Sequence, residues 1–284
     1  MRVLVTGCKG QLGTEMHRLS VEHTKHSYVY VDIDELDLTD GEAVNRLVEK
    51  EKTDVIVNCA AYTNVDGAEE NEAAALRVNA DAVENLARTG RKIIHISTDY
   101  IFSGEGWLPY KETDAAAPRT AYGRTKWEGE KRLKEWSRDA IVFRTAWLYS
   151  PWGKNFVKTM LKYGAEKDEL RVVYDQIGSP TYAGDLARVI YAALDADEWH
   201  AGTYHVTDEG VCSWYDFTVE ILRQANEREN KYKARVRPIR SDEYVYKTPR
   251  PHYSVLDKQK VKETFGVSIP HWTESLKECL EQMI

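Results

Sequence analysis

The chain has 284 residues, of which 42% are hydrophobic and 30% are charged, and its formal net charge at pH 7 is −7. A chain of this length can bury a sizeable core as one large α/β domain or as two unequal ones. Because the charge balance is acidic and no segment needs a basic face to explain it, we exclude nucleic acid and the membrane surface as expected partners.

The first apolar run begins at residue 2, and no stretch of the sequence has the length and hydrophobicity of a signal peptide or a membrane span. The four cysteines, Cys8, Cys59, Cys212 and Cys279, are scattered without metal-ligand spacing. Unpaired cysteines inside buried segments are typical of a reducing compartment. We therefore expect a cytoplasmic protein.

Short β-branched runs alternate with helical patterns through the first half of the chain. Strands are predicted at residues 2–6, 28–32, 55–57, 93–96 and 141–143, and helices between them at 11–20, 41–50, 73–88 and 122–136. Continuous apolar strands favour a parallel sheet covered on both faces. The predicted fold class is therefore α/β, a doubly wound parallel sheet of the Rossmann type with right-handed connections.

After about residue 149 the alternation stops, and loops containing Pro and Trp separate the remaining elements. These elements are predicted as helices at 181–195, 214–226, 258–264 and 273–282 and a strand at 203–206, with the charge run 227–233 as a solvated loop. We interpret the region as a smaller, interrupted C-terminal substrate lobe. The predicted dinucleotide-binding domain is 1–148, joined by about 181–200, and the predicted substrate-binding lobe is 149–180 and 201–284.

Three glycines, Gly7, Gly10 and Gly13, follow the first predicted strand and open the first predicted helix. In this context the first permits a tight turn, the second lets the backbone approach a pyrophosphate, and the third allows close packing of helix on strand. The helix N-terminus then offers free N–H groups and a partial positive charge to the phosphates. The pattern predicts a dinucleotide site, although glycine is also common in such turns for steric reasons alone.

Asp32 ends the second predicted strand, where its carboxylate can influence the choice between the two nicotinamide coenzymes. A carboxylate there can accept hydrogen bonds from the adenosine 2′-hydroxyl and repels a 2′-phosphate. Asp34 and Asp37 are nearby alternatives, and an acidic turn without a coenzyme role is a further interpretation. Since Lys9 can pair with a phosphate, the sequence leaves NADH and NADPH both open.

Tyr122 stands four residues before Lys126 in a predicted helix, and Thr98 ends the preceding strand. Residues four apart share one face of a helix, so the lysine ammonium can lie near the tyrosine phenol. A cation there, together with an oxidised nicotinamide ring, is expected to lower the pKa of the phenol towards the working range. Tyr122 would act as a general acid, and Thr98 as a second donor to the same carbonyl oxygen.

The same spacing occurs at Tyr163 and Lys167, so the spacing alone proves little. At that second pair, Gly164 is expected to interrupt the helix, and no hydroxyl at a strand end precedes it. The pair at Tyr122 has a polar turn before it, good helix formers after it, and Thr98 on the neighbouring strand. We therefore predict this pair and the threonine as the catalytic residues, with the lysine also binding the nicotinamide ribose; a surface Tyr/Lys pair is the competing interpretation.

These residues resemble the extended short-chain dehydrogenase/reductase superfamily, and longer motifs narrow the resemblance. In chain order the motifs are Asn58-Cys59-Ala60-Ala61-Tyr62-Thr63-Asn64-Val65-Asp66, Val78-Asn79-Ala80, Ser97-Thr98-Asp99-Tyr100-Ile101-Phe102, Arg144-Thr145-Ala146-Trp147, Asp175-Gln176-x-Gly178-x-Pro180-Thr181 and Arg250-Pro251-x-x-Ser254. In this order they resemble the dTDP-4-dehydrorhamnose reductase family over nearly the whole chain. The resemblance implies NADPH- or NADH-dependent reduction of the 4-keto group of dTDP-4-dehydro-β-L-rhamnose to dTDP-L-rhamnose, with the proton supplied by Tyr122.

The resemblance also implies binding residues. Positions that match contacts to the dinucleotide are Gln11, Leu12, Asp37, Leu38, Ala60, Ala61 and Tyr62, in addition to the glycine turn, Asp32 and Lys126. Positions implied at the nucleotide-sugar substrate are Thr98, Asp99, Tyr100, Tyr122, Trp147, Asn155 and Gln176. For the last three, simple packing or loop capping is the competing explanation.

Some members of the family are described as homodimers bridged by Mg²⁺ through glutamates. Glu15 matches one such position, whereas the remaining ligands cannot be placed in this sequence. A glutamate in the first turn of a helix is also explained by the helix dipole. The resemblance therefore leaves Mg²⁺ and a homodimer open, and no metal ligand beyond Glu15 is assigned.

Three other functions compete with the reductase. A nucleotide-sugar 4,6-dehydratase shares the fold but needs an Asp-Glu pair after the threonine, and here Tyr100 follows Asp99. A 4-epimerase, which keeps its NAD through a full redox cycle, is not excluded. A regulatory subunit of the same fold, such as the family's partner of methionine adenosyltransferase, is disfavoured because Thr98, Tyr122 and Lys126 are intact.

Overall fold

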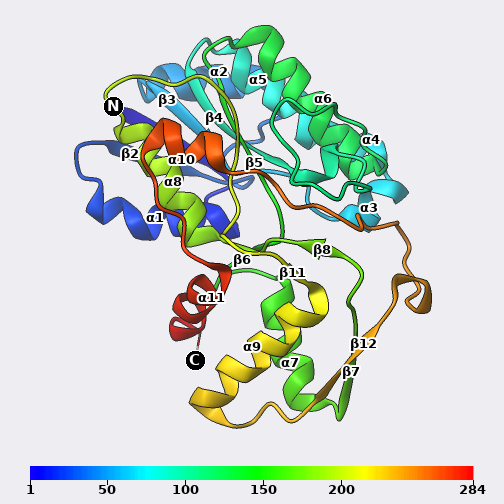
Figure 1. The fold of residues 1–284 in the computed structure, drawn as a ribbon. Coiled ribbons are helices and arrows are strands. Elements are labelled where there is room, and N and C mark those ends of the chain that lie inside the picture. The colour runs from blue at the N-terminus through cyan, green and yellow to red at the C-terminus, as the bar shows by residue number, and fades with distance from the viewer. Residues whose placement is uncertain (284) are drawn as a thin grey trace.

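Six parallel strands form the main sheet of the computed structural model, which describes residues 1–283. From one edge to the other they are β10 (Gly202–His205), β5 (Ile141–Thr145), β4 (Lys92–Thr98), β3 (Val55–Asn58), β1 (Arg2–Thr6) and β2 (Ser27–Val31). All adjacent pairs run parallel. The chain starts inside the sheet, runs out to β2 and returns across β3, β4 and β5, which confirms the predicted doubly wound architecture (Figure 1).

Helices cover both faces of this sheet (Figure 1). One face carries α1 (Gln11–Leu19), α8 (Ala183–Asp195) and α10 (Gln259–Phe265), and the other carries α2 (Gly41–Lys50), α5 (Ala82–Arg88) and α6 (Ala121–Trp136). The side chains of β1 alternate accordingly, since Val3 and Val5 pack in the first core and Leu4 packs in the second. All three are fully buried, as expected for a strand covered on both faces.

The predicted helix at 73–88 contains a π-helical turn. Residues Arg77–Asp81 form this turn between α4 (Glu72–Leu76) and α5, and it places the side chain of Asn79 inside the protein. Asn79 accepts from the N–H of Tyr62 at 2.9 Å and donates to the Tyr62 carbonyl at 3.1 Å. The irregular turn therefore fixes the segment that follows β3, in keeping with the frequent occurrence of π turns at functional sites.

A separate core holds the smaller lobe together, which lies below the main sheet in Figure 1. Its main elements are α7 (Phe156–Glu166), β7 (Glu169–Val173), α9 (Trp214–Glu229), β12 (Arg235–Ile239) and α11 (Trp272–Glu281). Short strand pairs join it to the sheet: β6 (Leu148–Tyr149) with β9 (Thr181–Tyr182), and β8 (Ile177–Gly178) with β11 (Cys212–Ser213). The chain enters this lobe more than once, as predicted for an interrupted lobe.

Two segments that the sequence assigns to the substrate lobe pack on the main sheet instead. β10 pairs with β5 at the sheet edge, and Val261 and Phe265 of α10 pack into the core beside α8. A strand of four residues is too short for its pattern to indicate which sheet it joins. The helix at 181–195 does return to the main sheet, because α8 packs along α1. The functional division between the two lobes remains a prediction.

The sequence pattern does not predict α7, β7 or β12. Gly164 is expected to interrupt a helix, but it lies inside α7, where the bare backbone lets Leu222 of α9 approach closely; an added Cβ would lie 2.5 Å from the Leu222 Cδ2 atom. The charge run 227–233 is partly helical, because α9 continues to Glu229 and ends at Asn230 in the left-handed conformation.

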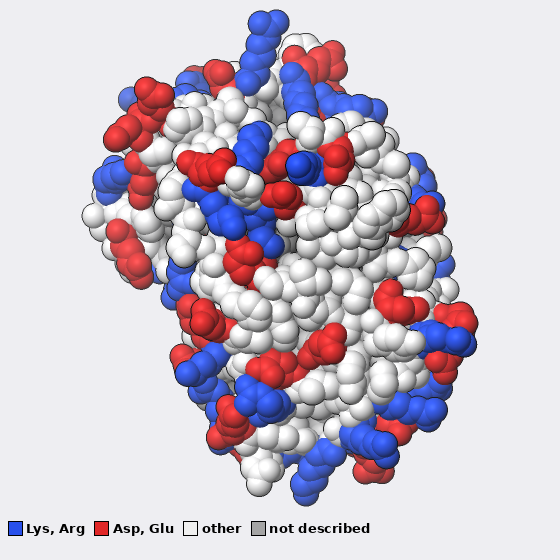
Figure 2. Space-filling model, in the orientation of Figure 1, with Lys and Arg blue, Asp and Glu red and all other residues white. Residues whose placement is uncertain are grey.

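The surface carries both signs of charge. On the face shown in Figure 2, acidic and basic side chains are interspersed over both lobes. Many of the charged side chains are paired, among them Arg124 with Glu72 and Arg188 with Glu278. Within residues 1–283, no helix combines the length and the hydrophobicity needed to cross a bilayer.

Candidate active site

The glycine turn after β1 has the geometry that its sequence predicts. Gly7 has a φ of 65°, and a Cβ on it would lie 2.7 Å from the Ala60 nitrogen. A Cβ on Gly13 would collide with the backbone of Gly7 and Cys8. Gly10 is the N-cap of α1 and brings no side chain to cap it, so the first N–H groups of this helix face outward, available to an anion.

A cavity of about 420 Å³ opens beside this turn, at the carboxyl ends of β1, β2 and β3. The predicted coenzyme residues that line it are Gly7, Gly10, Asp32, Asp37, Leu38, Ala60 and Ala61. The strand order reverses at β1, and doubly wound sheets bind their ligands at such a switch point. The bare backbone at the turn and the small, apolar lining fit a dinucleotide.

The other predicted coenzyme residues do not line this cavity. Leu12 is buried in the core beneath α8. The Gln11 side chain points to the smaller lobe, where its Oε1 atom accepts from Asn155 at 2.9 Å and from Ser150 at 3.2 Å. Tyr62 is held by the backbone contacts to Asn79 described above. Contacts of these residues with a coenzyme stay predictions.

Asp32 and Lys9 stand together at this cavity. The Asp32 carboxylate accepts from the backbone N–H of Lys9 at 2.8 Å and of Ile33 at 2.9 Å, so it shapes the glycine turn as well as placing a negative charge there. The Lys9 ammonium lies 2.8 Å from Asp34 and 3.0 Å from Glu35. Asp34, one of the two predicted alternatives to Asp32, thus pairs with Lys9, the one lysine that lines the described cavity.

The local sequence explains why α6 begins where it does. Thr120 caps the helix, since its Oγ1 atom accepts from the N–H of Gly123 at 3.0 Å. A Cβ on Gly123 would collide with the Tyr100 carbonyl, and one on Gly129 would collide with the Asn79 carbonyl. These two glycines let α6 lie directly against the end of β4 and the π turn. The helix therefore presents Tyr122 to the end of the sheet.

Thr98, Asp99, Tyr100 and Tyr122 meet at the carboxyl end of β4. Thr98 donates to Asp99 Oδ1 at 2.9 Å and accepts from the N–H of Tyr100 at 3.2 Å. The rings of Tyr100 and Tyr122 pack edge to face with centroids 5.4 Å apart. Thr98, Asp99 and Tyr122 are all buried. The structure thus brings the predicted hydroxyl and phenol together.

Burial dominates the ionisation of this group. It raises the pKa of Tyr122 above its ordinary value, and the hydrogen bond with Thr98 offsets only part of that rise. The phenol is therefore protonated at neutral pH, and the expected lowering of its pKa does not occur in the chain alone. Burial also raises the pKa of Asp99 to about 7, and its Oδ2 atom has no partner among the described residues.

Lys126 lies one turn after Tyr122 and is almost fully buried, with 2% of its surface exposed. Its ammonium donates to the carbonyl of Ile96 on β4 at 2.6 Å. Burial lowers the pKa of Lys126 to about 8, although Glu130 on the next turn acts in the opposite direction. A lysine held in this way titrates close to physiological pH.

A second cavity, of about 640 Å³, lies between the lobes. Among the predicted substrate residues it is lined by Tyr100, Trp147 and Gln176. Trp147 has a positive φ of 49° and stacks on Trp214 of α9 with ring centroids 3.5 Å apart. A bulky residue in this backbone region is strained, and such strain is found where the surrounding structure requires it. Gln176 donates to the Tyr246 hydroxyl at 2.6 Å.

Asn155 does not line this cavity. Its Oδ1 atom caps α7 by accepting from the N–H of Lys158 at 3.0 Å, and its Nδ2 atom donates to Gln11 and to the Ser150 carbonyl. The side chain is thus engaged in helix capping and in joining the lobes. A contact of Asn155 with substrate stays a prediction, and capping explains its position.

Several residues that line the second cavity were given no role in the sequence analysis. Arg171, Trp214, Lys247 and Arg250 are among them. Arg250 donates to Asp66 of α3 (Val65–Glu70) at 3.0 Å, and its Nη1 atom is buried without a partner among the described residues. Its position in the Arg250-Pro251 motif was the available signal, because a charged residue in a loop is a candidate for binding.

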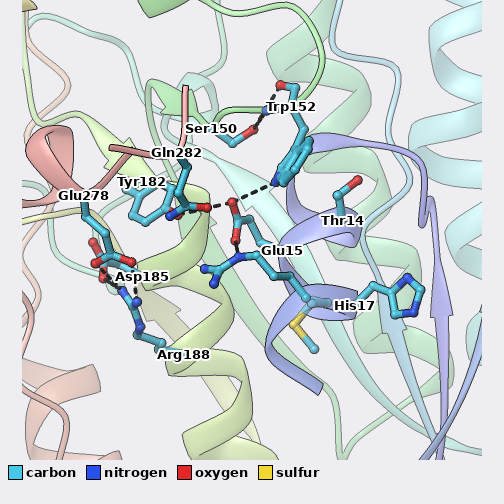
Figure 3. A network of polar contacts seen from close by, with 12 residues as sticks. Thr14, Glu15, His17, Ser150, Trp152, Tyr182, Asp185, Arg188, Glu278 and Gln282 are labelled. Atoms are coloured by element: carbon cyan, nitrogen blue, oxygen red, sulfur yellow. Dashed lines mark hydrogen bonds and ion pairs between the residues drawn. The ribbon is translucent and has the colours of Figure 1, made fainter. Parts of the chain in front are cut away.

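Glu15 is placed unfavourably for a metal ion (Figure 3). It is fully buried, and its carboxylate already accepts from Arg18 at 2.8 Å, from the Trp152 indole at 3.0 Å and from the Tyr182 hydroxyl at 3.3 Å. Among residues 1–283, no group of three or more His, Cys, Asp or Glu side chains could hold a metal. The suggested Mg²⁺ site at Glu15 is thus not supported. The carboxylate joins α1 to the smaller lobe through Trp152 and Tyr182 instead.

The chain has a glycine turn after its first strand, and a Tyr/Lys pair one helical turn apart beside a threonine at the end of its fourth strand. This is the arrangement of extended short-chain dehydrogenases/reductases, and the chain is of this class. More closely, it belongs to the family described as the RmlD substrate binding domain, whose model matches residues 1–284. The resemblance found in the sequence motifs is thereby confirmed.

Three similar proteins cover nearly the whole chain. A dTDP-4-dehydrorhamnose reductase of Aggregatibacter actinomycetemcomitans is 39% identical over 285 residues, covering 97% of each chain. A probable dTDP-4,6-dihydroxy-2-methyloxan-3-one 4-ketoreductase of Streptomyces antibioticus is 39% identical over 289 residues, covering 100% of this chain and 96% of that one. The crystal structure of a dTDP-4-dehydrorhamnose reductase of Bacillus anthracis in complex with NADP is 36% identical, with a TM-score of 0.93 over 99% of each chain.

Proposed function

We propose that the protein is an oxidoreductase that uses NADPH or NADH to reduce the 4-keto group of dTDP-4-dehydro-β-L-rhamnose, giving dTDP-L-rhamnose. One observation carries the proposal: Thr98 and Tyr122 meet at the carboxyl end of β4 beside a residue that lines the second cavity, with Lys126 one helical turn further on. Tyr122 packs on Tyr100, which lines the second cavity, and Thr98 lies beside both. Lys126 is held against β4 by its hydrogen bond to the Ile96 carbonyl.

NAD(P)H supplies the hydride when it is bound, and the chain supplies the proton and the positioning. Tyr122 is protonated at neutral pH, which is the form that reduction of a ketone requires of a general acid. Thr98 donates a second hydrogen bond to the same oxygen and stabilises the charge that develops on it. Lys126 binds the nicotinamide ribose and so orients the coenzyme against Tyr122.

The second cavity suits a nucleoside diphosphate sugar. The stacked rings of Trp147 and Trp214 offer an apolar face, and Arg250 offers a guanidinium N–H that has no partner within residues 1–283. Asp99 and Tyr100 would lie beside the sugar. Because Asp99 has a pKa of about 7, it is present in both protonation states near neutral pH and can donate to or accept from a sugar hydroxyl.

We propose that both coenzymes are used, and that Lys9 decides the use of NADPH. Asp32 disfavours a 2′-phosphate, whereas the Lys9 ammonium lies at the same cavity and can leave Asp34 and Glu35 to pair with one. Lys9→Gln is expected to raise the KM for NADPH roughly three- to five-fold, as typical for an exposed charge pair, and to leave the KM for NADH within a factor of about two. Steady-state kinetics with each coenzyme measures both values.

Lys50→Gln is the matched control, because Lys50 is an exposed lysine at the end of α2 and does not line the cavity. It should change neither KM. An equal rise of both KM values in Lys9→Gln would instead show that Lys9 supports the glycine turn without selecting a phosphate.

The proposed function is tested by incubating the purified chain with dTDP-4-dehydrorhamnose and following NADH and NADPH separately. One equivalent of coenzyme should be oxidised for each ketosugar consumed. A 4-epimerase would turn over without net loss of coenzyme, and a regulatory subunit would show no turnover. A second candidate is the 4-ketoreductase of another dTDP-sugar, which the likeness to the Streptomyces antibioticus protein favours. A higher kcat/KM for such a ketosugar would support it.

The cysteines of the chain, Cys8, Cys59, Cys212 and Cys279, are all free thiols, which suits the expected cytoplasmic location. A homodimer also stays a prediction, and sedimentation of the purified protein would measure its mass.

A further inference from the structure

A chain of buried polar groups runs beneath Lys126, from β1 through β3 to β4. The Thr6 hydroxyl donates to Asn58 Oδ1 at 2.7 Å, and Asn58 Nδ2 lies 3.1 Å from His95 Nδ1. His95 Nε2 in turn lies 3.5 Å from the Lys126 nitrogen. Thr6, Asn58 and His95 are each no more than 1% exposed. The catalytic mechanism described above uses none of these three.

The backbone fixes the direction of every hydrogen bond in this series of buried polar groups. The N–H of Ala60 can only donate, and it points to Asn58 Oδ1 at 3.2 Å. The other end of the amide, which faces His95, is therefore the NH₂ group. His95 Nδ1 must accept from it, so the single proton of the neutral imidazole sits on Nε2, the atom that faces Lys126.

We propose that His95 is a positioning residue for Lys126. The Nε2–H group of His95 faces the lysine nitrogen and holds the lysine side chain against the end of β4. Until coenzyme binds, it favours the amine form of Lys126 over the ammonium form. The inference deepens the proposed function, since it concerns the same lysine. An N–H group facing an ammonium is unfavourable, whereas it can donate to the lone pair of an amine. Hydroxyls of a bound ribose would then supply the acceptors that favour the ammonium.

The charges around the site agree with this assignment. Burial and the neighbouring Lys126 hold the pKa of His95 well below its ordinary value, so the imidazole stays neutral. On its own helix Lys126 faces Tyr122 and Glu130, and Glu130 is bound by two hydrogen bonds from Arg144 of β5, at 2.9 and 2.8 Å. Because this carboxylate is already paired, it favours the Lys126 ammonium less than a free one would.

The test is an NMR titration of ¹³C-labelled lysine in the protein without coenzyme or ketosugar, with the Lys126 signal assigned by its loss in Lys126→Met. The wild-type signal should titrate near pH 8. His95→Asn keeps an acceptor for Asn58 Nδ2 and removes the N–H that faces Lys126, and His95→Leu also removes this N–H. Both should move the midpoint up, by about one pH unit in His95→Asn.

His26→Gln is the control, since His26 also has a buried side chain but pairs with Asp195 at the far edge of the sheet. It should leave the midpoint unchanged. An unchanged or lower midpoint in whichever His95 variant folds, as judged by its thermal transition, would overturn the proposal. Because no coenzyme or sugar is present, this result is independent of whether the proposed reaction takes place.

Discussion

Tyr122→Phe is expected to lower kcat by a factor on the order of 10² or more and to leave coenzyme affinity nearly unchanged. The variant keeps the ring that packs on Tyr100 and removes only the hydroxyl, which supplies a proton in the transition state. The fold should tolerate the change, because Thr98 is the hydrogen-bond partner that the phenol has within residues 1–283. Steady-state kinetics and titration of coenzyme fluorescence measure the two quantities.

Tyr163→Phe provides a matched control. Tyr163 also precedes a lysine by four residues, and Lys167 lies 4.4 Å from its ring centroid, but the pair belongs to the end of α7 in the smaller lobe. Its replacement should not affect kcat. If Tyr122→Phe kept wild-type turnover, the proton would come from another group, and Asp99 would be the first to examine.

Lys126→Met is expected to lower kcat and coenzyme affinity together and, at the same time, to stabilise the fold at neutral pH. In the proposed function the lysine binds the nicotinamide ribose and orients the coenzyme against Tyr122, so both kinetic terms would depend on it. The stabilising effect of the Lys126→Met substitution has a separate cause. A lysine with a pKa of about 8 in the folded chain, against 10.5 when unfolded, disfavours folding wherever its side chain is charged, and most strongly below pH 8.

The sign of the pH dependence follows from that difference. Between about pH 8 and 10.5 the unfolded chain binds more protons at this site than the folded chain does. The wild-type free energy of unfolding therefore increases as pH rises through this window, because the unfavourable contribution of Lys126 is lost. Below pH 8 the full penalty, about 3 kcal/mol, is present. Lys126→Met should remove this contribution. Urea unfolding at pH 7 and pH 10 measures it, and a variant that is less stable than wild type at pH 7 would contradict the assignment.

Much of the site could be predicted because its signals are local in the sequence. The glycine turn follows its strand directly, and its Gly7 needs a positive φ that few other residues adopt. The bounds of α2 agree with the prediction because Asp40 caps its first turn, accepting from the N–H of Ala43. Tyr122 and Lys126 lie four residues apart on α6, and this spacing alone places them on one face of the helix.

The features that sequence could not predict depend on contacts between distant segments. In the sequence Gly164 indicates a helix break, and only the structure shows that Leu222 packs against it inside a helix. Glu15 matches a suggested metal position, but only the fold brings Trp152 and Tyr182 to its carboxylate. His95 reads as one polar residue in an apolar strand, and its role emerges only when Asn58 and Lys126 are placed on either side of it.

The central claim is that this chain transfers hydride to the sugar carbonyl while Tyr122 protonates the oxygen. It is tested most directly with coenzyme deuterated on the transferred position of the nicotinamide ring and dTDP-4-dehydrorhamnose as substrate. The account predicts one deuterium at C4 of the product for each coenzyme oxidised, and a rate of transfer that falls on the order of 10² or more in Tyr122→Phe. A product without deuterium at C4, or undiminished transfer in the variant, would contradict it.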